Sequence, residues 1–251
     1  MPKPREMAIA SRTVKIPGDG GVMPAYVAQP KARGKYPVVI VLIEAHGVNA
    51  HMKNVTERFA RNGYVAICPD LYYRQGTGLV ARYEETEKAF GWVRVMYDAQ
   101  TMIDIRIVID YAKRMAKADP RRIATTGYCL GGILSWMAAC LNRDIKAAAV
   151  YYGTLVSPVP TVKRPLSPHL YAETLQAPIL AIFGEADAKI PLANVREAEA
   201  HVNRLGKVNK FIIYPGAGHG FMAEGRDTYH KASAEDAWKQ TLAWFAKHLR
   251  A

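Results

Sequence analysis

The stretch RIATTGYCLGG, residues 122–132, joins an apolar, strand-like run to a glycine-rich turn that contains a cysteine. A helix-like pattern follows at once, over residues 131–141. Gly127, Cys129 and Gly131 fit a nucleophile elbow, a strained strand-to-helix turn that presents a nucleophile and needs small neighbours. The start of a helix also favours the thiolate form of a cysteine. The stretch therefore predicts an α/β fold with Cys129 as nucleophile, the alternative being a glycine-rich turn around a buried cysteine.

Apolar runs and helical patterns alternate on both sides of this turn. The alternation is typical of a mainly parallel sheet with helices on both faces. We expect about seven to eight strands, opened by an antiparallel hairpin of residues 13–17 and 23–29 around the turn GDGG. The later strands are predicted at residues 36–44, 64–71, 122–128, 147–152, 178–183 and 210–214. The helices are predicted at residues 50–62, 97–118, 131–141, 192–205 and 232–248.

Length and composition favour a single domain, residues 1–251. The chain is 50% hydrophobic and contains no low-complexity linker and no repeat of solenoid length. Its basic N-terminal residues are not followed by a signal-peptide-like run, and no apolar segment is long enough to span a bilayer. Three cysteines cannot all pair, which fits a reducing compartment. We expect a soluble, cytoplasmic protein, monomeric or homodimeric.

The formal net charge of +12 raises the question of a nucleic-acid partner. Lysine and arginine are spread along the chain, without a basic tract or a basic motif interleaved with aromatic residues. We therefore expect no nucleic acid and no membrane as partner, but a small molecule, and the positive surface would favour an anionic one. The sequence shows no metal-ligand cluster and no cofactor motif, so no metal or cofactor is expected.

Two further loops follow predicted strands in the order that a catalytic triad on this fold requires. The first is GEAD, residues 184–187, and the second is PGAGHGF, residues 215–221. Asp187 is the predicted acid, with Glu185 as the alternative, and His219 is the predicted base. His219 would take the proton of Cys129 and later return a proton to the leaving group, while Asp187 fixes the imidazole tautomer. The remaining histidines, including His46 and His51 in the loop after residue 44, are interpreted as structural.

Two irregular segments, residues 72–95 and 154–173, also follow predicted strands. Segments at the carboxyl ends of strands commonly line pockets or act as lids. Both are therefore expected to shape a substrate site.

Taken together, these motifs resemble the dienelactone hydrolase (carboxymethylenebutenolidase) family of the α/β-hydrolase superfamily, over essentially the whole chain. The likeness rests on GYCLGG, GEAD, GAGHGF and the glutamate that ends the strand VVIVLIE. The resemblance implies that Glu44 contacts the resting cysteine and swings on substrate binding to help generate the thiolate. It also implies an oxyanion hole made by the backbone N–H groups of Leu130 and Ala45.

Departures from the family pattern concern the substrate. The family type binds a substrate carboxylate with arginines, one of them four residues after the histidine, where this chain has Ala223. The candidates to replace that arginine are Arg226, Arg74, Arg82 and Arg94. As tentative substrate-binding residues we take Arg74, Arg82, Tyr128 and Phe221.

The resulting expectation is a cysteine-dependent carboxylic ester hydrolase that cleaves a lactone or an activated enol or aryl ester through a thioester acyl-enzyme. The alternatives are a promiscuous carboxylesterase, a phosphotriesterase or peptidase on the same triad, and a non-catalytic ligand-binding homologue.

Overall fold

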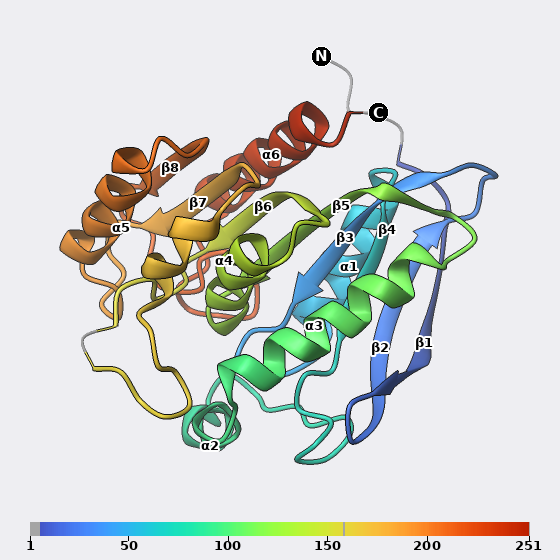
Figure 1. The fold of residues 1–251 in the computed structure, drawn as a ribbon, viewed down its shortest axis with the longest axis horizontal. Coiled ribbons are helices and arrows are strands. Elements are labelled where there is room, and N and C mark those ends of the chain that lie inside the picture. Colours follow the sequence, from blue (N-terminus) through green and yellow to red (C-terminus); the bar gives the residue numbers. More distant parts are fainter. Residues whose placement is uncertain (1–5, 158, 251) are drawn as a thin grey trace.

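The computed structural model describes residues 6–157 and 159–250. Their strands form an eight-stranded sheet in the order β1-β2-β4-β3-β5-β6-β7-β8 (Figure 1). β1 pairs antiparallel with β2 and β2 antiparallel with β4, and the pairs from β4 to β8 are parallel. The strands are β1 Ile9–Gly18, β2 Gly21–Pro30, β3 Tyr36–Leu42, β4 Val65–Pro69, β5 Ala118–Tyr128, β6 Ile145–Tyr151, β7 Ile179–Gly184 and β8 Asn209–Tyr214.

Helices connect the parallel strands and cover both faces of the sheet. They are α1 Ala50–Arg61, α2 Thr86–Arg94, α3 Asp98–Lys113, α4 Leu130–Leu141, α5 Leu192–Arg204 and α6 Lys231–His248, together with the 3-10 turn η1 Pro168–Thr174. α1 and α6 share one face, because Phe59 of α1 packs against Trp238 and Phe245 of α6 with ring centroids 4.5 and 6.0 Å apart. α3 and α4 lie on the opposite face, in front of the sheet in Figure 1.

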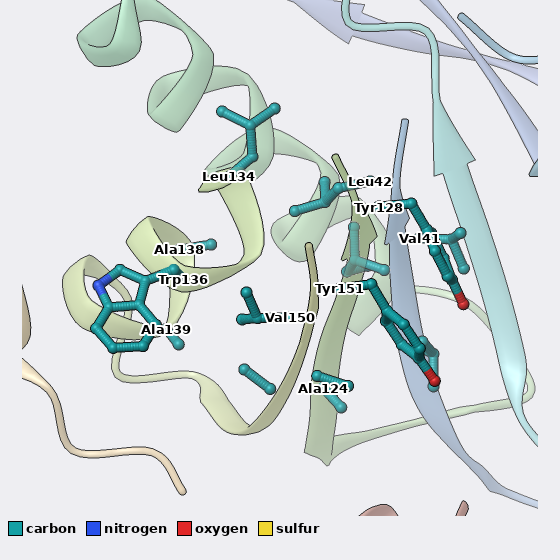
Figure 2. Close-up of a cluster of buried hydrophobic side chains, with 14 of the residues drawn as sticks. Val41, Leu42, Ala124, Tyr128, Leu134, Trp136, Ala138, Ala139, Val150 and Tyr151 are labelled. Atoms are coloured by element: carbon teal, nitrogen blue, oxygen red, sulfur yellow. The ribbon is translucent and has the colours of Figure 1, made fainter. Parts of the chain in front are cut away.

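The central strands are apolar on both faces because each face is covered. Figure 2 shows the alternation: Leu42 and Val150 lie on the side of α4, and Tyr128 and Tyr151 lie on the other side of the sheet. The two tyrosine rings stack with centroids 4.6 Å apart. Successive side chains of a strand point to opposite faces, so a two-sided core needs hydrophobic residues at every position.

The predicted α/β fold with a mainly parallel sheet and helices on both faces is confirmed. The predicted helix 97–118 was too long, because α3 ends at Lys113 and β5 already begins at Ala118. Pro120 disfavours helical backbone at the residue before it, which suits the extended start of β5. Helix α2, inside the segment 72–95, and the turn η1, which begins inside the segment 154–173 and ends at Thr174, were not predicted. The second segment includes residue 158, which lies outside the described residues.

No helix in the described part of the chain has the length and apolar composition that crossing a membrane requires.

Candidate active site

The nucleophile candidate lies at the junction of β5 and α4. Cys129 follows the last residue of β5 and precedes the first residue of α4, and its backbone has φ 55° and ψ −112°. A left-handed φ is unfavourable for a residue with a side chain, so the surrounding structure must hold this turn. The neighbouring glycines make it possible, because a Cβ on Gly127 would overlap the carbonyl oxygen of Gly131, and a Cβ on Gly131 would overlap that of Leu42.

His219 and Asp187 come together from two different loops after β8 and β7. The His219 Nδ1 lies 2.7 Å from Asp187 Oδ2, and both side chains are buried. The other carboxylate oxygen of Asp187 accepts from the N–H groups of Lys189, at 2.8 Å, and Ile190, at 3.2 Å. These bonds fix the carboxylate, which in turn fixes the imidazole. Glu185, the alternative acid, is exposed and accepts from the Gly216 N–H at 3.3 Å.

The electrostatics of His219 follow from its two neighbours. Burial by itself lowers the pKa of His219, but its bonds with Asp187 and with Cys129, which lies against the imidazole, raise that pKa to about 9. Its Nε2 makes no hydrogen bond of normal geometry within the described residues. The raised pKa favours the charged imidazole, which Asp187 orients, and its second nitrogen is left for the thiol or a substrate.

Glu44 is fully buried just beyond the end of β3. Its Oε1 accepts from Asn49 Nδ2 at 2.7 Å, and its Oε2 lies 3.7 Å from Arg226 Nη2. The amide of Asn49 has a second task, since its Oδ1 accepts from the Met52 N–H at 3.0 Å and caps α1. One side chain therefore anchors both the start of α1 and the carboxylate of Glu44.

Arg226 provides the positive charge beside Glu44. Its guanidinium lies over the ring of Tyr83, 4.2 Å from the centroid, and its Nη2 lies 3.3 Å from His46 Nδ1. Burial lowers the pKa of His46, which favours its neutral form. Among the described residues, Glu44 and Arg226 each have only this one ion-pair partner. Of the arginines considered from the sequence, Arg226 is the one that reaches Glu44.

The two backbone N–H groups expected to form an oxyanion hole belong to the residues directly after Cys129 and Glu44. Among the described residues, no hydrogen bond is donated by the N–H of Leu130, at the start of α4, or by that of Ala45, directly after Glu44. Tyr72 helps to hold this loop, because its hydroxyl donates to the Ala45 carbonyl at 2.9 Å. Free amides near a nucleophile can bind a developing oxyanion.

Tyr152 packs directly on the catalytic histidine candidate. Its ring centroid lies 5.2 Å from that of His219, and its backbone has a left-handed φ of 36°. It is fully buried, and burial raises the pKa of its phenol. Tyr152 was not among the predicted site residues, whereas Tyr72 and Tyr83 lie in the segment 72–95 that was expected to shape a substrate site. Asn49 was recognisable in part, because asparagine is a favoured N-cap and stands directly before the helix predicted at residue 50.

The tentative substrate-binding residues have the following surroundings. Arg74 pairs with Asp104 and lies over the ring of Tyr73, at 4.5 Å. The side chain of Arg82 is 81% exposed and lies 3.6 Å from Glu85. Tyr128 and Phe221 are completely buried, Tyr128 against Tyr151 and Phe221 against Tyr152. Arg94 pairs with Glu87 at the surface.

No cluster of three or more histidine, cysteine, aspartate or glutamate side chains suited to a metal ion occurs in residues 6–157 and 159–250.

Comparison with known proteins identifies relatives over most of the chain. The model of the dienelactone hydrolase family matches residues 23–249. A protein of Methylorubrum extorquens named "Putative carboxymethylenebutenolidase" is 38% identical over 236 residues, which cover 94% of this chain and 80% of that protein. A Synechocystis protein of the same name is 34% identical over 247 residues, which cover 96% of this chain and 98% of that protein.

Solved structures agree with this result. The crystal structure of a "Putative Dienelactone Hydrolase" from Klebsiella pneumoniae is 38% identical, with a TM-score of 0.90, covering 96% of this chain and 99% of that one. A dienelactone hydrolase-like promiscuous phosphotriesterase from metagenomic libraries has a TM-score of 0.81 at 18% identity, covering 97% of this chain and 100% of that one, and this likeness concerns the fold alone. The chain belongs to the dienelactone hydrolase family.

Proposed function

We propose that this protein hydrolyses an ester or lactone through a thioester acyl-enzyme, with Cys129 as nucleophile, His219 as base and Asp187 as orienting acid. The observation that carries the proposal is the arrangement of these three groups. Cys129 projects from a strained turn against an imidazole whose other nitrogen lies 2.7 Å from a buried carboxylate. Family membership supports hydrolysis of a carboxylic ester, since relatives carry the name carboxymethylenebutenolidase.

The first half of the reaction forms the thioester. The Cys129 sulfur attacks the substrate carbonyl carbon, and its proton resides on His219. The N–H groups of Leu130 and Ala45 hold the oxyanion of the tetrahedral intermediate, each contributing about 3 kcal/mol to the transition state. As the intermediate collapses, the carbon–oxygen bond breaks and His219 gives its proton to the leaving oxygen.

The second half releases the acid. Water attacks the thioester carbonyl while His219 takes one of its protons, and the collapse returns the electron pair to the Cys129 sulfur. A thiolate is itself easily expelled, so the first half favours a substrate whose own leaving group is good. Enol and aryl esters should therefore react much faster than alkyl esters or amides, and equal rates on ethyl and p-nitrophenyl esters would contradict this account.

Glu44 is proposed to assist rather than to replace His219. Its carboxylate is held by Asn49 and Arg226 in this structure. Transfer of the Cys129 proton to Glu44 would require that the carboxylate leave these two partners. Family likeness assigns to Glu44 a contact with the resting cysteine and a swing on substrate binding, whereas in this structure its carboxylate accepts from Asn49 at 2.7 Å and lies 3.7 Å from Arg226.

The decisive experiment measures hydrolysis of p-nitrophenyl acetate and of a dienelactone by the wild type and by Cys129→Ala. Cys140→Ala is the matched control, because Cys140 is a buried thiol of α4 and burial raises its pKa. Loss of nearly all activity in Cys129→Ala alone, with iodoacetamide labelling confined to Cys129, supports the proposal. Full activity of Cys129→Ala, or no hydrolysis of either substrate by the wild type, contradicts it.

A further inference from the structure

The imidazole of His219 is anchored at one of its two nitrogens. Its Nδ1 lies 2.7 Å from Asp187 Oδ2, whereas its Nε2 makes no hydrogen bond of normal geometry within the described residues. A single hydrogen bond fixes one atom of a ring but leaves the ring free to turn about that contact. The direction of Nε2, the nitrogen that must serve Cys129, therefore depends on what packs against the ring.

The ring of Tyr152 supplies this packing. Its centroid lies 5.2 Å from that of His219, with the two planes tilted by 60°, and 5.4 Å from that of Phe221. His219 and Phe221 belong to the same loop, residues 215–221, here called the histidine loop. Tyr152 is completely buried. One enclosed side chain thus contacts the histidine loop at two residues, the proposed base included.

The backbone that carries this ring is tied to the turn of the proposed nucleophile. The Cys129 N–H donates to the carbonyl of Tyr151 at 3.0 Å. On the other side of Tyr152, Gly153 packs on the first turn of α4 so closely that a Cβ there would lie 2.7 Å from the carbonyl carbon of Gly132. The ring of Tyr152 therefore connects the nucleophile turn with the histidine loop.

The conformation of Tyr152 is imposed by its surroundings. Its φ of 36° lies in the left-handed region, which is unfavourable for a residue with a side chain. Its N–H donates to the carbonyl of Ile182 on β7 at 2.8 Å, which helps to hold this backbone. Such outliers persist where the surrounding structure over-determines them, and they cluster at functional sites. The hydroxyl has no hydrogen-bond partner among the described residues, so the ring is what this side chain contributes to the site.

We propose that Tyr152 is a positioning residue, whose ring holds the imidazole of His219 so that Nε2 stays directed at Cys129. The inference rests on the proposed function, because the direction of Nε2 matters only if these two residues react together. Tyr152 itself exchanges no proton with the substrate. Loss of its ring should therefore lower the rate of the chemical step and leave substrate binding largely unchanged.

Variants of Tyr152 separate the ring from the hydroxyl. Tyr152→Phe removes only the hydroxyl, and Tyr152→Leu removes the ring, while both keep a side chain on the strained backbone. If Tyr152→Leu does not fold, Tyr152→Met takes its place, because methionine adapts to irregular gaps without supplying a rigid ring. Phe245→Leu is the matched control, since Phe245 is also fully buried but packs on Phe59 and Tyr64, at centroid distances of 6.0 and 6.3 Å.

Steady-state hydrolysis of p-nitrophenyl acetate gives kcat and KM for each variant that melts cooperatively. We expect Tyr152→Leu to lower kcat about 100-fold with a much smaller change in KM, the order of loss that follows when a reacting group is misplaced by about 1 Å. Tyr152→Phe should have nearly the wild-type kcat, and so should Phe245→Leu, despite a lower melting temperature. A wild-type kcat in Tyr152→Leu, or an equal loss in Tyr152→Phe, would overturn the inference.

A second measurement follows the imidazole itself. The Nδ1 proton of His219, buried in the bond to Asp187, should give a low-field proton NMR resonance, which is assigned by its loss in His219→Gln. The resonance should persist in Tyr152→Phe and Phe245→Leu. In Tyr152→Leu it should shift or broaden, because the imidazole then samples several orientations. An unchanged resonance in Tyr152→Leu would count against the inference.

The two measurements also separate this inference from the proposed function. If Cys129→Ala keeps full activity while the resonance is lost in Tyr152→Leu alone, the proposed function fails and the ring still orients His219. If Cys129→Ala is inactive while Tyr152→Leu has the wild-type resonance and kcat, the proposed function stands and the positioning role of Tyr152 is rejected.

Discussion

Asn49 offers the sharpest test of how the site is held together. Its amide oxygen accepts from the Met52 N–H at 3.0 Å and so caps α1, and its amide nitrogen donates to Glu44 at 2.7 Å. Asn49→Ala removes both bonds. Asn49→Ser keeps a hydroxyl that can cap the helix, but it is too short to reach Glu44 in the same way, so the pair of variants separates the two tasks.

The expected magnitudes follow from the two kinds of bond. Loss of an N-cap costs about 1 kcal/mol. Loss of a hydrogen bond to a charged group costs about 1.5–3 kcal/mol, and the buried position of Glu44 places it in the upper part of that range. Asn49→Ser should therefore lower the free energy of unfolding by about 2–3 kcal/mol, and Asn49→Ala by about 1 kcal/mol more.

Urea-induced unfolding measures these differences, and a double-mutant cycle with Glu44→Ala isolates the bond between the two side chains. Neighbouring residues that interact directly show coupling energies of about 0.5–3 kcal/mol. A coupling energy indistinguishable from zero, or equal stability of Asn49→Ser and the wild type, would refute the reading that Asn49 holds the Glu44 carboxylate.

Three further predictions concern the triad and the elbow. Asp187→Asn should lower kcat on p-nitrophenyl acetate by about 10⁴-fold with a smaller change in KM, because the imidazole loses its fixed tautomer, and retention of a tenth of the wild-type kcat would contradict the assignment. The pKa of His219 is raised from 6.5 to about 9, so its stabilising contribution is complete below the lower value and is lost as pH rises through the upper one. The free energy of unfolding should fall over that interval in the wild type and less in Asp187→Asn, as measured by urea unfolding at several pH values. Gly131→Ala should unfold the protein or lower its stability by more than about 3 kcal/mol. Gly91→Ala is the control: it lies in a helix with open space where a Cβ would stand, so it should be neutral or raise stability by up to about 1 kcal/mol. Thermal melts of both variants check these expectations.

The sequence contained most of the information on the fold because local and global signals coincide. The strands 36–44 and 178–183 are apolar at nearly every position, which only a sheet covered on both faces explains. The boundary errors arose where the local pattern was ambiguous. Residues 114–117 continue a helix-like composition after α3. The segment 72–95 contains the short helix α2, whose only buried residue is Ala89, so its apolar pattern is weak.

The triad candidates could be recognised from the sequence for a different reason. Cys129, Asp187 and His219 each lie in a short turn directly after a strand, and the carboxyl ends of parallel strands meet at one edge of the sheet. The surroundings of Glu44 could not be predicted, because they depend on how three loops from distant parts of the chain meet. Nothing in the local sequence of Tyr83 or Arg226 indicates that the tyrosine ring would lie against the guanidinium of Arg226.

The position of Arg226 also bears on the meaning of the net charge. A chain with a formal charge of +12 invites the interpretation that its substrate is anionic. Yet Arg226, at the buried corner of the site, is paired with Glu44, and Arg74 is paired with Asp104. The excess of positive charge therefore lies on the solvated surface. There it can raise the rate of encounter with an anion, whereas Arg226 would have to leave Glu44 in order to retain one.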